Sequence, residues 1–343
     1  MLKKIINECR FTLTLETKSP FIVRDGRYEK KKGNQQDPNN IPIHRGDLNF
    51  NKNYVNQNCL IPGTSLRGVI RSHAEKIVRT IVEDENNPLC CDPFDDDDTL
   101  QSPKVSCSKR MDKKLPPISY ANACVICKLF GCTGIASRIQ IHDSTIKSIG
   151  KVVARDGIGI DRFTGGVSSG ANFMNWVLEG YTFQSEITIR NFELWQLGLL
   201  AYVFRDFEQE LVTIGFGKSK GFGRVKGEIN KVELTYCRDN QNQLKGIAEL
   251  CSEDEINAYD LVRNIYDSFQ ADIDKVKLVK SERDFYRTKF SVQTNQNNGG
   301  IIKSDFWKAC AKSWNEAVDR RKFKTIPDLK ALQRITEGEG ENG

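Results

Sequence analysis

Six of the eleven cysteines in this chain lie between residues 90 and 132. Cys124 and Cys127 are separated by two residues, a spacing that lets both thiolates bind one tetrahedral zinc ion. The candidates for the other two ligands are Cys90, Cys91, Cys107 and Cys132. Because four thiolates fill the coordination sphere and leave no open position for a substrate, the spacing predicts a structural zinc site that takes no part in catalysis.

A glycine-rich segment at residues 215–224 carries four glycines, two phenylalanines and three cations. Glycine lets backbone N–H groups approach a phosphate closely, and a phenylalanine could stack on a base. The cations that would supply positive charge are Lys218, Lys220 and Arg224. The segment does not fit the phosphate-binding P-loop pattern, because Val212 stands where the first glycine is required. A tight hairpin with its phenylalanines in the core is an equal alternative.

A helix is predicted from Thr64 onward, because apolar residues between Leu66 and Ile81 recur at spacings of three and four. Arg67 and Arg71 lie one turn apart near its start, where the helix dipole favours anions and two arginines add donors for a phosphate. The alternative is an ordinary solvated helix face.

The same helix carries His73 and Glu75, and together with the later cysteine pair they imitate the zinc-dependent nucleoside deaminases. In those enzymes a histidine binds the metal and a glutamate transfers protons. Two features argue against this class: Ala123 occupies the position of a proline in that pattern, and His73 lies on the apolar stripe of the helix. We therefore favour a core histidine and keep the deaminase as an alternative.

Hydrophobic periodicity predicts an α+β protein. The expected strands span residues 11–15, 139–141, 181–189 and 225–236, and a densely apolar helix spans 194–204. This order of strands and helices, with one split pair, predicts a ferredoxin-like core that carries large insertions. Beyond residue 237 the composition changes, and we expect charged helices near 255–270 and 304–320.

The net charge is +6, which fits a polyanionic partner but is too small to identify one by itself. No apolar run approaches the roughly 18 residues of a membrane helix. The first residues have no apolar signal core. We therefore expect a cytoplasmic protein without a membrane partner.

In their order along the chain, these motifs resemble those of the RAMP superfamily of CRISPR proteins, most closely the backbone subunits of type III effector complexes. Residues 61–68 (IPGTSLRG) are similar to the family's turn at the start of its first helix. Residues 124–131 (CVICKLFG) and 136–138 (ASR) are similar to its zinc-binding knuckle and the strand that follows. Residues 155–165 (RDGIGIDRFTG) resemble its thumb hairpin, and 215–224 resemble its glycine-rich loop.

The resemblance implies an RRM-like, ferredoxin-like RAMP domain over residues 1–236, with a zinc-containing insertion at 83–132 and a thumb at 153–180. Residues 237–343 would form a charged helical extension that matches nothing in the family. The implied partners are a CRISPR guide RNA, its target RNA, other RAMP subunits and the large subunit of a type III complex. The thumb would wedge into the duplex of guide and target.

The resemblance also implies roles for individual residues. Those expected to bind guide RNA are Arg67, Arg71, Arg138, Arg162, Lys218, Lys220 and Arg224. Cys107 and Cys91 are expected to complete the zinc site with Cys124 and Cys127, and Cys91 is chosen because it begins a Cys-Asp-Pro sequence.

In such families an aspartate in the loop before the first helix cuts target RNA. Asp47 lies at about that place, and Asp25 and Asp37 are its rivals. One carboxylate suffices, because the 2′-hydroxyl of RNA is the nucleophile, and the carboxylate would act as base or as ligand to a magnesium ion. The alternative is a subunit of the same complex that binds RNA without cutting it.

Overall fold

The computed structural model describes residues 4–24, 57–81, 89–94, 106–109, 120, 123–259, 261, 276, 278–283, 286–294, 300–319 and 323. The helices and short 3-10 turns in these ranges are α2 (Gly63–Ile81), α3 (Val125–Phe130), α4 (Leu194–Glu208), η3 (Lys218–Lys220), η4 (Ile247–Glu249), α5 (Glu253–Tyr259), α7 (Gly300–Lys303) and α8 (Asp305–Asp319). The strands are β1 (Asn7–Thr17), β2 (Ile139–Ile141), β3 (Thr145–Ser148), β4 (Lys151–Ile160), β5 (Val167–Glu179), β6 (Thr182–Arg190), β7 (Val225–Tyr236), β8 (Val279–Arg283) and β9 (Thr288–Gln293).

One antiparallel sheet with the strand order β2-β6-β1-β7-β9-β8 organises the molecule, and β3 also pairs with β6. Along β1 the side chains alternate, so that Phe11 and Leu13 are buried while Arg10 and Thr12 are exposed. This alternation means that one face of the sheet is covered and the other faces solvent. The chain order through this sheet is β-α-β-β-α-β, counting β2 and β3 as one split strand.

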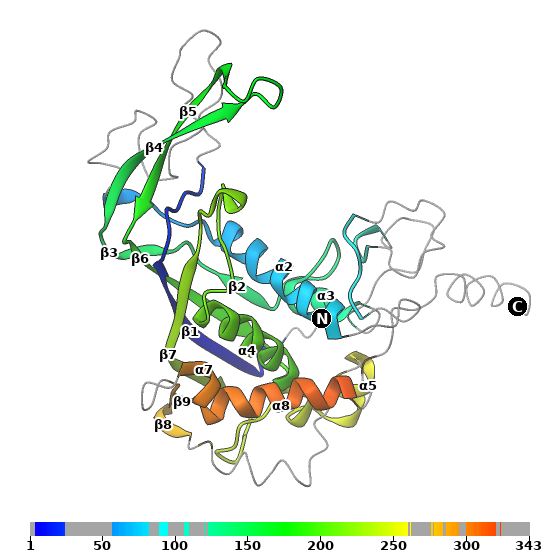
Figure 1. Cartoon of the computed structure of the whole chain (residues 1–343). Coiled ribbons are helices and arrows are strands. Elements are labelled where there is room, and N and C mark those ends of the chain that lie inside the picture. The colour runs from blue at the N-terminus through cyan, green and yellow to red at the C-terminus, as the bar shows by residue number, and fades with distance from the viewer. Residues whose placement is uncertain are drawn as a thin grey trace, which may run out of the picture.

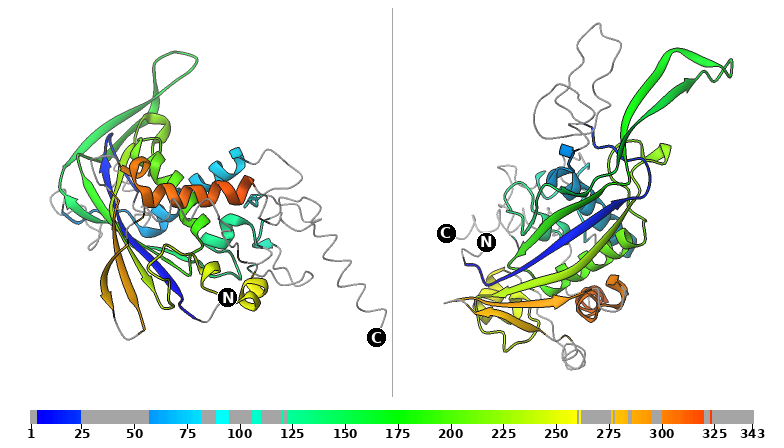
Figure 2. Two further views of the ribbon diagram at one scale, coloured as in Figure 1. Left: turned by 90° about the horizontal axis from the view of Figure 1, so that it is seen from below. Right: turned by 90° about the vertical axis from the view of Figure 1, so that its left-hand side faces the viewer.

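Helices α2, α4 and α8 cover the buried face of the sheet (Figures 1 and 2). The ring of Phe11 on β1 packs edge-on against Phe204 of α4, with ring centroids 5.3 Å apart, and against Trp307 of α8 at 5.8 Å. These aromatic side chains form the centre of the core. Among the described residues, no helix has both the length and the apolar character needed to cross a membrane.

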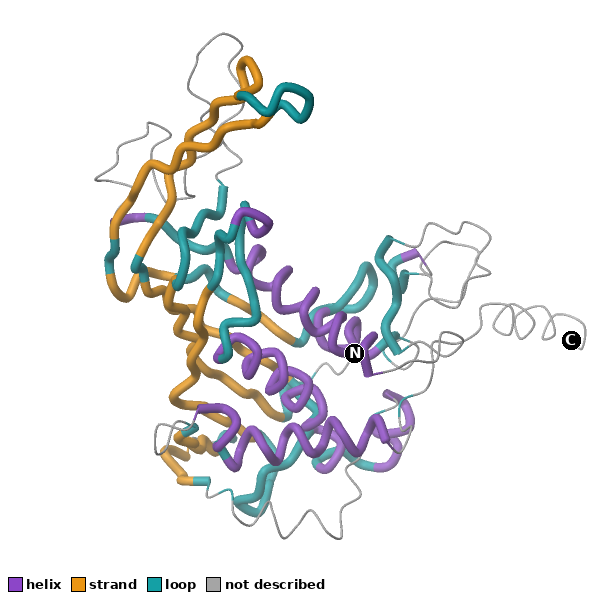
Figure 3. The backbone as a smooth tube through the Cα atoms, in the orientation of Figure 1, coloured by secondary structure: helices purple, strands orange, loops and turns teal. Residues whose placement is uncertain are grey.

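Strands β4 and β5 form a separate two-stranded sheet that projects from the main body as an arm (Figure 3). Val152 and Leu178 at the base of this β4–β5 arm are buried. Toward the tip the apolar side chains are exposed, and Phe163 is 99% exposed. The arm thus presents apolar surface that the chain itself does not cover.

The segment after Tyr236 differs from the sequence-based expectation, which was of helices alone. Strands β8 and β9 continue the sheet, because β9 pairs with β7 along residues 231–236. Phe290 and Val292 of β9 are buried there. Helix α8 packs against α4, and its Trp314 lies 6.1 Å from Trp195 between ring centroids. The described part of this segment therefore covers both the edge and one helix of the β-α-β-β-α-β unit.

Candidate metal centre and nucleic-acid interface

Four buried cysteines gather at the end of α2. The sulfur atoms of Cys91, Cys107, Cys124 and Cys127 all lie within 4.8 Å of one another, and each residue is at most 3% exposed. The Sγ atoms of Cys124 and Cys91 are 3.6 Å apart, and those of Cys91 and Cys127 are 3.8 Å apart. A tetrahedron with zinc–sulfur bonds of about 2.3 Å has sulfur–sulfur edges of about 3.8 Å. The cluster therefore fits a closed four-thiolate zinc site.

The local chain geometry explains why the cysteine pair lies at this point. Cys124 caps α3, and its Sγ accepts the backbone N–H of Cys127 at 3.4 Å. The helix ends after one and a half turns at Gly131, whose φ of +76° disfavours other residues. A Cβ atom there would lie 2.6 Å from the carbonyl oxygen of Ile135. This short helix holds two thiols on one side, facing the segments that carry the other two.

The cluster contains the four cysteines that the resemblance implied. Of the two rivals, Cys90 is buried beside it, but its thiol donates to the backbone carbonyl of Cys91 at 3.4 Å. Cys132 is half-buried. The pKa of Cys124 lies well below its ordinary value, because the thiols around it, that of Cys107 first, donate hydrogen bonds to its sulfur. The same shared hydrogen bonds raise the pKa of Cys107 and of Cys127, so the case for a metal rests on the placement of the four sulfurs and not on their titration.

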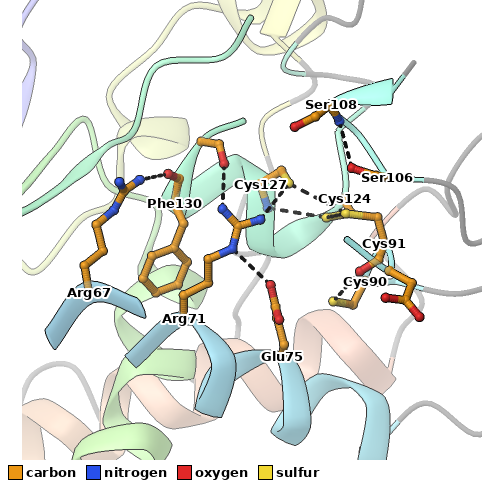
Figure 4. A network of polar contacts seen from close by, with 12 residues as sticks. Arg67, Arg71, Glu75, Cys90, Cys91, Ser106, Ser108, Cys124, Cys127 and Phe130 are labelled. Carbon is orange, nitrogen blue, oxygen red and sulfur yellow. Dashed lines mark hydrogen bonds and ion pairs between the residues drawn. The ribbon is translucent and has the colours of Figure 1, made fainter. Parts of the chain in front are cut away.

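Arg71 connects helix α2 to the cysteine cluster, and Arg67 connects it to the end of α3 (Figure 4). Arg71 donates to the Sγ of Cys127 at 3.6 Å, to the carbonyl oxygen of Gly131 at 3.1 Å and to Glu75 at 3.0 Å. Burial lowers the pKa of Arg71, but the bond to Glu75 and the potential of Cys127 outweigh this effect, so the pKa is raised. Arg67 donates to the carbonyl oxygen of Phe130. Both arginines thus stabilise the end of α3.

The pair considered for a deaminase lies apart from the metal cluster. The Nε2 atom of His73 is 2.8 Å from Asp206 on α4, and Glu75 pairs with Arg71. Four sulfurs already complete a tetrahedron, so no position remains for a histidine ligand or a catalytic water. The geometry gives this alternative no support.

Arg138, a predicted RNA contact, is only 5% exposed and lies in a polar network inside the protein. It donates to the carbonyl oxygen of Asn191 at 2.7 Å and to the carboxylate of Glu193 at 3.3 Å. Its guanidinium also lies 4.0 Å from the ring centroid of Tyr120, whose hydroxyl donates to Glu193 at 2.5 Å. A contact between Arg138 and a phosphate would require this network to open.

The glycine-rich loop is built on left-handed backbone. Gly215, Gly217, Gly221 and Gly223 have φ angles between +80° and +89°. At Gly215 a Cβ atom would lie 2.2 Å from the carbonyl oxygen of Ile22, and at Gly223 it would lie 2.1 Å from that of Ile214. At Gly221 a Cβ would meet nothing within 4 Å. Gly215 and Gly223 are therefore required both by close packing and by their positive φ. Gly221 is required by its positive φ alone and lies on an open side of the loop.

The charged side chains of this loop are exposed. Lys218 and Lys220 lie on the single turn η3. Arg224 is also exposed, and its Nε atom is 3.4 Å from the carboxylate of Glu210. Both Phe216 and Phe222 are half-buried, so the alternative with these rings in the core is wrong. The loop presents cations and open backbone on one surface, which is the chemistry that binds phosphates.

Arg162 lies in the turn at the tip of the β4–β5 arm and is exposed. The turn is closed by Asp161, whose carboxylate accepts the backbone N–H groups of Thr164 at 2.9 Å and Phe163 at 2.7 Å. These two bonds lower the pKa of Asp161. The three aspartates considered for catalysis, Asp25, Asp37 and Asp47, lie outside the described residues.

The fold and the site define an α+β protein in which one β-α-β-β-α-β unit carries a closed four-cysteine centre, a cationic glycine-rich loop and a projecting arm. The family model of the RAMP superfamily matches residues 14–226, and the chain belongs to this superfamily. Membership indicates a CRISPR-associated, RNA-binding subunit. The comparison with curated proteins gave no match.

Proposed function

We propose that this protein is a guide-RNA-binding backbone subunit of a type III CRISPR effector complex. The cationic glycine-rich loop is the observation that carries this proposal, because its lysines and open backbone suit RNA phosphates. The β-α-β-β-α-β order supports a ferredoxin-like domain, and the β4–β5 arm has the form of the thumb hairpin. The partners would be the guide RNA, its target, other RAMP subunits and the large subunit.

The exposed cations would make the direct contacts with the guide. These are Lys218, Lys220 and Arg162, while Arg224 would shift from Glu210 toward the RNA. Arg67, Arg71 and Arg138 would act mainly by holding the elements beside the RNA, since each binds groups of the protein. We therefore expect the exposed cations to determine the RNA affinity, and the arginines that bind groups of the protein to determine the stability of the fold.

Replacing Lys218 and Lys220 together with alanine should weaken binding of guide RNA to a similar extent for every guide sequence. Each phosphate contact on single-stranded RNA contributes about 0.7 to the slope of log affinity against log salt, so the slope should fall by about 1.4. Fluorescence anisotropy with labelled RNA at several salt concentrations measures both quantities. The double variant Lys303→Ala with Lys308→Ala on α7 and α8 is the matched control. An unchanged slope in the Lys218–Lys220 variant would mean that the loop is a structural turn and does not bind RNA.

Cleavage of target RNA is the second part of the proposal, with Asp47 as the key carboxylate. The 2′-hydroxyl of the target would attack the adjacent phosphorus while Asp47 takes its proton. The bond to the 5′ oxygen of the next nucleotide breaks and that oxygen takes a proton from water, which leaves a 2′,3′-cyclic phosphate and a 5′-hydroxyl. Asp47 would therefore act by positioning the reacting groups and removing a proton, and it would contribute little to the RNA affinity.

Asp47→Ala should lower the rate of target cleavage at one position by at least about 100-fold, the range of general base catalysis. Guide and target affinity should stay almost unchanged, because a carboxylate repels phosphate. The assay follows labelled target RNA in an assembled complex, with and without magnesium, alongside Asp25→Ala and Asp37→Ala. Loss of cleavage only in one of those variants would move the role there. Wild type that binds target without cutting would identify the non-cleaving subunit.

A further inference from the structure

The ring of Phe216 in the glycine-rich loop gathers two cations from different parts of the chain. The guanidinium carbon of Arg24 lies 3.3 Å from the ring centroid, and the ammonium of Lys220 lies 5.6 Å from the same centroid. Both distances are within the range of attractive cation–π contacts. Arg24 follows β1 and is exposed. Arg24 was not among the residues expected from the sequence to bind RNA.

Backbone hydrogen bonds hold Arg24 at this loop independently of its side chain. Residues 18–24 run beside the loop, and the N–H of Phe216 donates to the carbonyl oxygen of Ile22 at 2.9 Å. The N–H of Gly223 donates to that of Pro20 at 2.8 Å. The segment before Arg24 is therefore part of the loop's framework. The backbone contacts bring the Arg24 guanidinium to the loop, and the contact with the Phe216 ring then orients it.

Three like charges are concentrated on this surface: those of Arg24, Lys218 and Lys220. Arg24 and Lys220 meet at the Phe216 ring, and Lys218 lies on the same single turn as Lys220. Within the described part of the chain, Lys218 has no ion pair, and the acid next to the loop, Glu210, pairs with Arg224. A surface that gathers cations in this way attracts a polyanion, which favours phosphate as the ligand.

We propose that Arg24 is a further phosphate-binding residue for the guide RNA, and that Phe216 is its positioning residue and does not stack on a base. The inference rests on the proposed function of the loop. A guanidinium that stacks on a ring uses its flat face, and its N–H donors lie in the plane of the group. That orientation presents the donors edge-on to a phosphodiester, where two of them can bind one phosphate.

The test measures the salt dependence of RNA binding by the full-length protein, with labelled single-stranded RNA of random sequence as the probe. Arg24→Ala should lower the slope of log affinity against log salt by about 0.7, the value of one lost phosphate contact. Arg24→Lys should keep the slope but weaken binding, because a lysine cannot bind in the bidentate manner. Leu211→Ala, at another exposed site on the main body, is the control for substitution itself.

The role of Phe216 is separated from base stacking by a double-mutant cycle. Phe216→Leu should reduce affinity only in the presence of Arg24, so the losses of the two single variants should not add, and Phe216→Tyr should bind as wild type does. Additive losses with an unchanged salt slope in Phe216→Leu would show that the ring stacks on a base and would overturn the inference. Thermal unfolding of each variant shows whether the loop has remained folded.

The outcomes also separate this inference from the proposed function. If the Lys218–Lys220 variant loses affinity while Arg24→Ala binds with an unchanged slope, the inference fails and the proposed function stands. If the wild-type protein shows no salt-dependent binding of RNA, both fail. A lower slope in both variants supports the two together.

Discussion

Purified protein should contain one zinc ion per chain, and the double variant Cys124→Ser with Cys127→Ser should contain none. Four sulfurs within 4.8 Å fit the edges of a zinc tetrahedron, and no smaller set of these ligands closes it. Zinc binding by peptides of this kind contributes about 10–16 kcal/mol, so its loss should unfold the segments that supply Cys91 and Cys107. Mass spectrometry of the metal content and limited proteolysis measure the two effects.

Cys90→Ser with Cys132→Ser is the matched control for the zinc site. It removes two cysteines from the same region that are not among the four clustered sulfurs, so zinc should remain at one per chain. Zinc retained without Cys124 and Cys127, or wild-type protein without zinc, would contradict the assignment. Guide RNA binding by the metal-free protein is expected to weaken only as far as the ends of α2 and α3 lose their order, since Arg67 and Arg71 connect the two.

Arg138→Ala should lower the free energy of unfolding by about 3–5 kcal/mol, because it leaves a buried carboxylate without its cation. Glu193 is 1% exposed, and its other partners include the hydroxyl of Tyr120, the indole N–H of Trp195 and the backbone N–H of Gln196. Urea unfolding followed by circular dichroism gives the value. The exposed pair of Arg190 and Glu8, 3.0 Å apart, is the control, and Arg190→Ala should cost at most about 1 kcal/mol.

Arg138→Ala also distinguishes a structural role of Arg138 from an RNA-binding role. A variant of Arg138 that unfolds at the wild-type urea concentration but loses RNA affinity would assign the residue to the RNA. Reduced stability with normal affinity in the folded fraction would keep it inside the network. Because the two roles differ in which quantity changes, the unfolding curve and the binding curve must be measured on one preparation.

The strands and helices of the central unit could be predicted because their patterns are long and regular. In β1 and β7 the apolar side chains alternate, and α4 is apolar almost throughout. Strands β8 and β9 were missed for a physical reason. β9 has only six residues, and its strand conformation depends on pairing with β7, which a local pattern cannot reveal.

At the candidate site, too, a local sequence pattern does not reveal the partners of single side chains. The cysteine spacing predicted Cys124 and Cys127 as metal ligands, since chelation by a nearby pair is a local property, whereas Cys91 and Cys107 were expected only from the family resemblance. The arginines were assigned by type and position, and their partners come from elsewhere in the fold. Glu193 follows Arg138 by 55 positions, and Phe216 is even further from Arg24. Without those partners a buried arginine and an RNA-binding one look alike in sequence.

The position of β1 at the centre of the sheet has a consequence for synthesis of the chain. Both neighbours of β1 are made much later, since Glu8 pairs with Arg190, 182 positions further on, and β7 follows after that. At about 5–20 residues per second, β1 waits on the order of 10–40 s on the ribosome before its first partner strand emerges. During that time Phe11, Leu13 and Leu15 lack the surfaces that later bury them. The first strand to be synthesised thus stays unpaired until more than half of the chain has been made, and the nascent chain exposes the apolar face of β1 during that time.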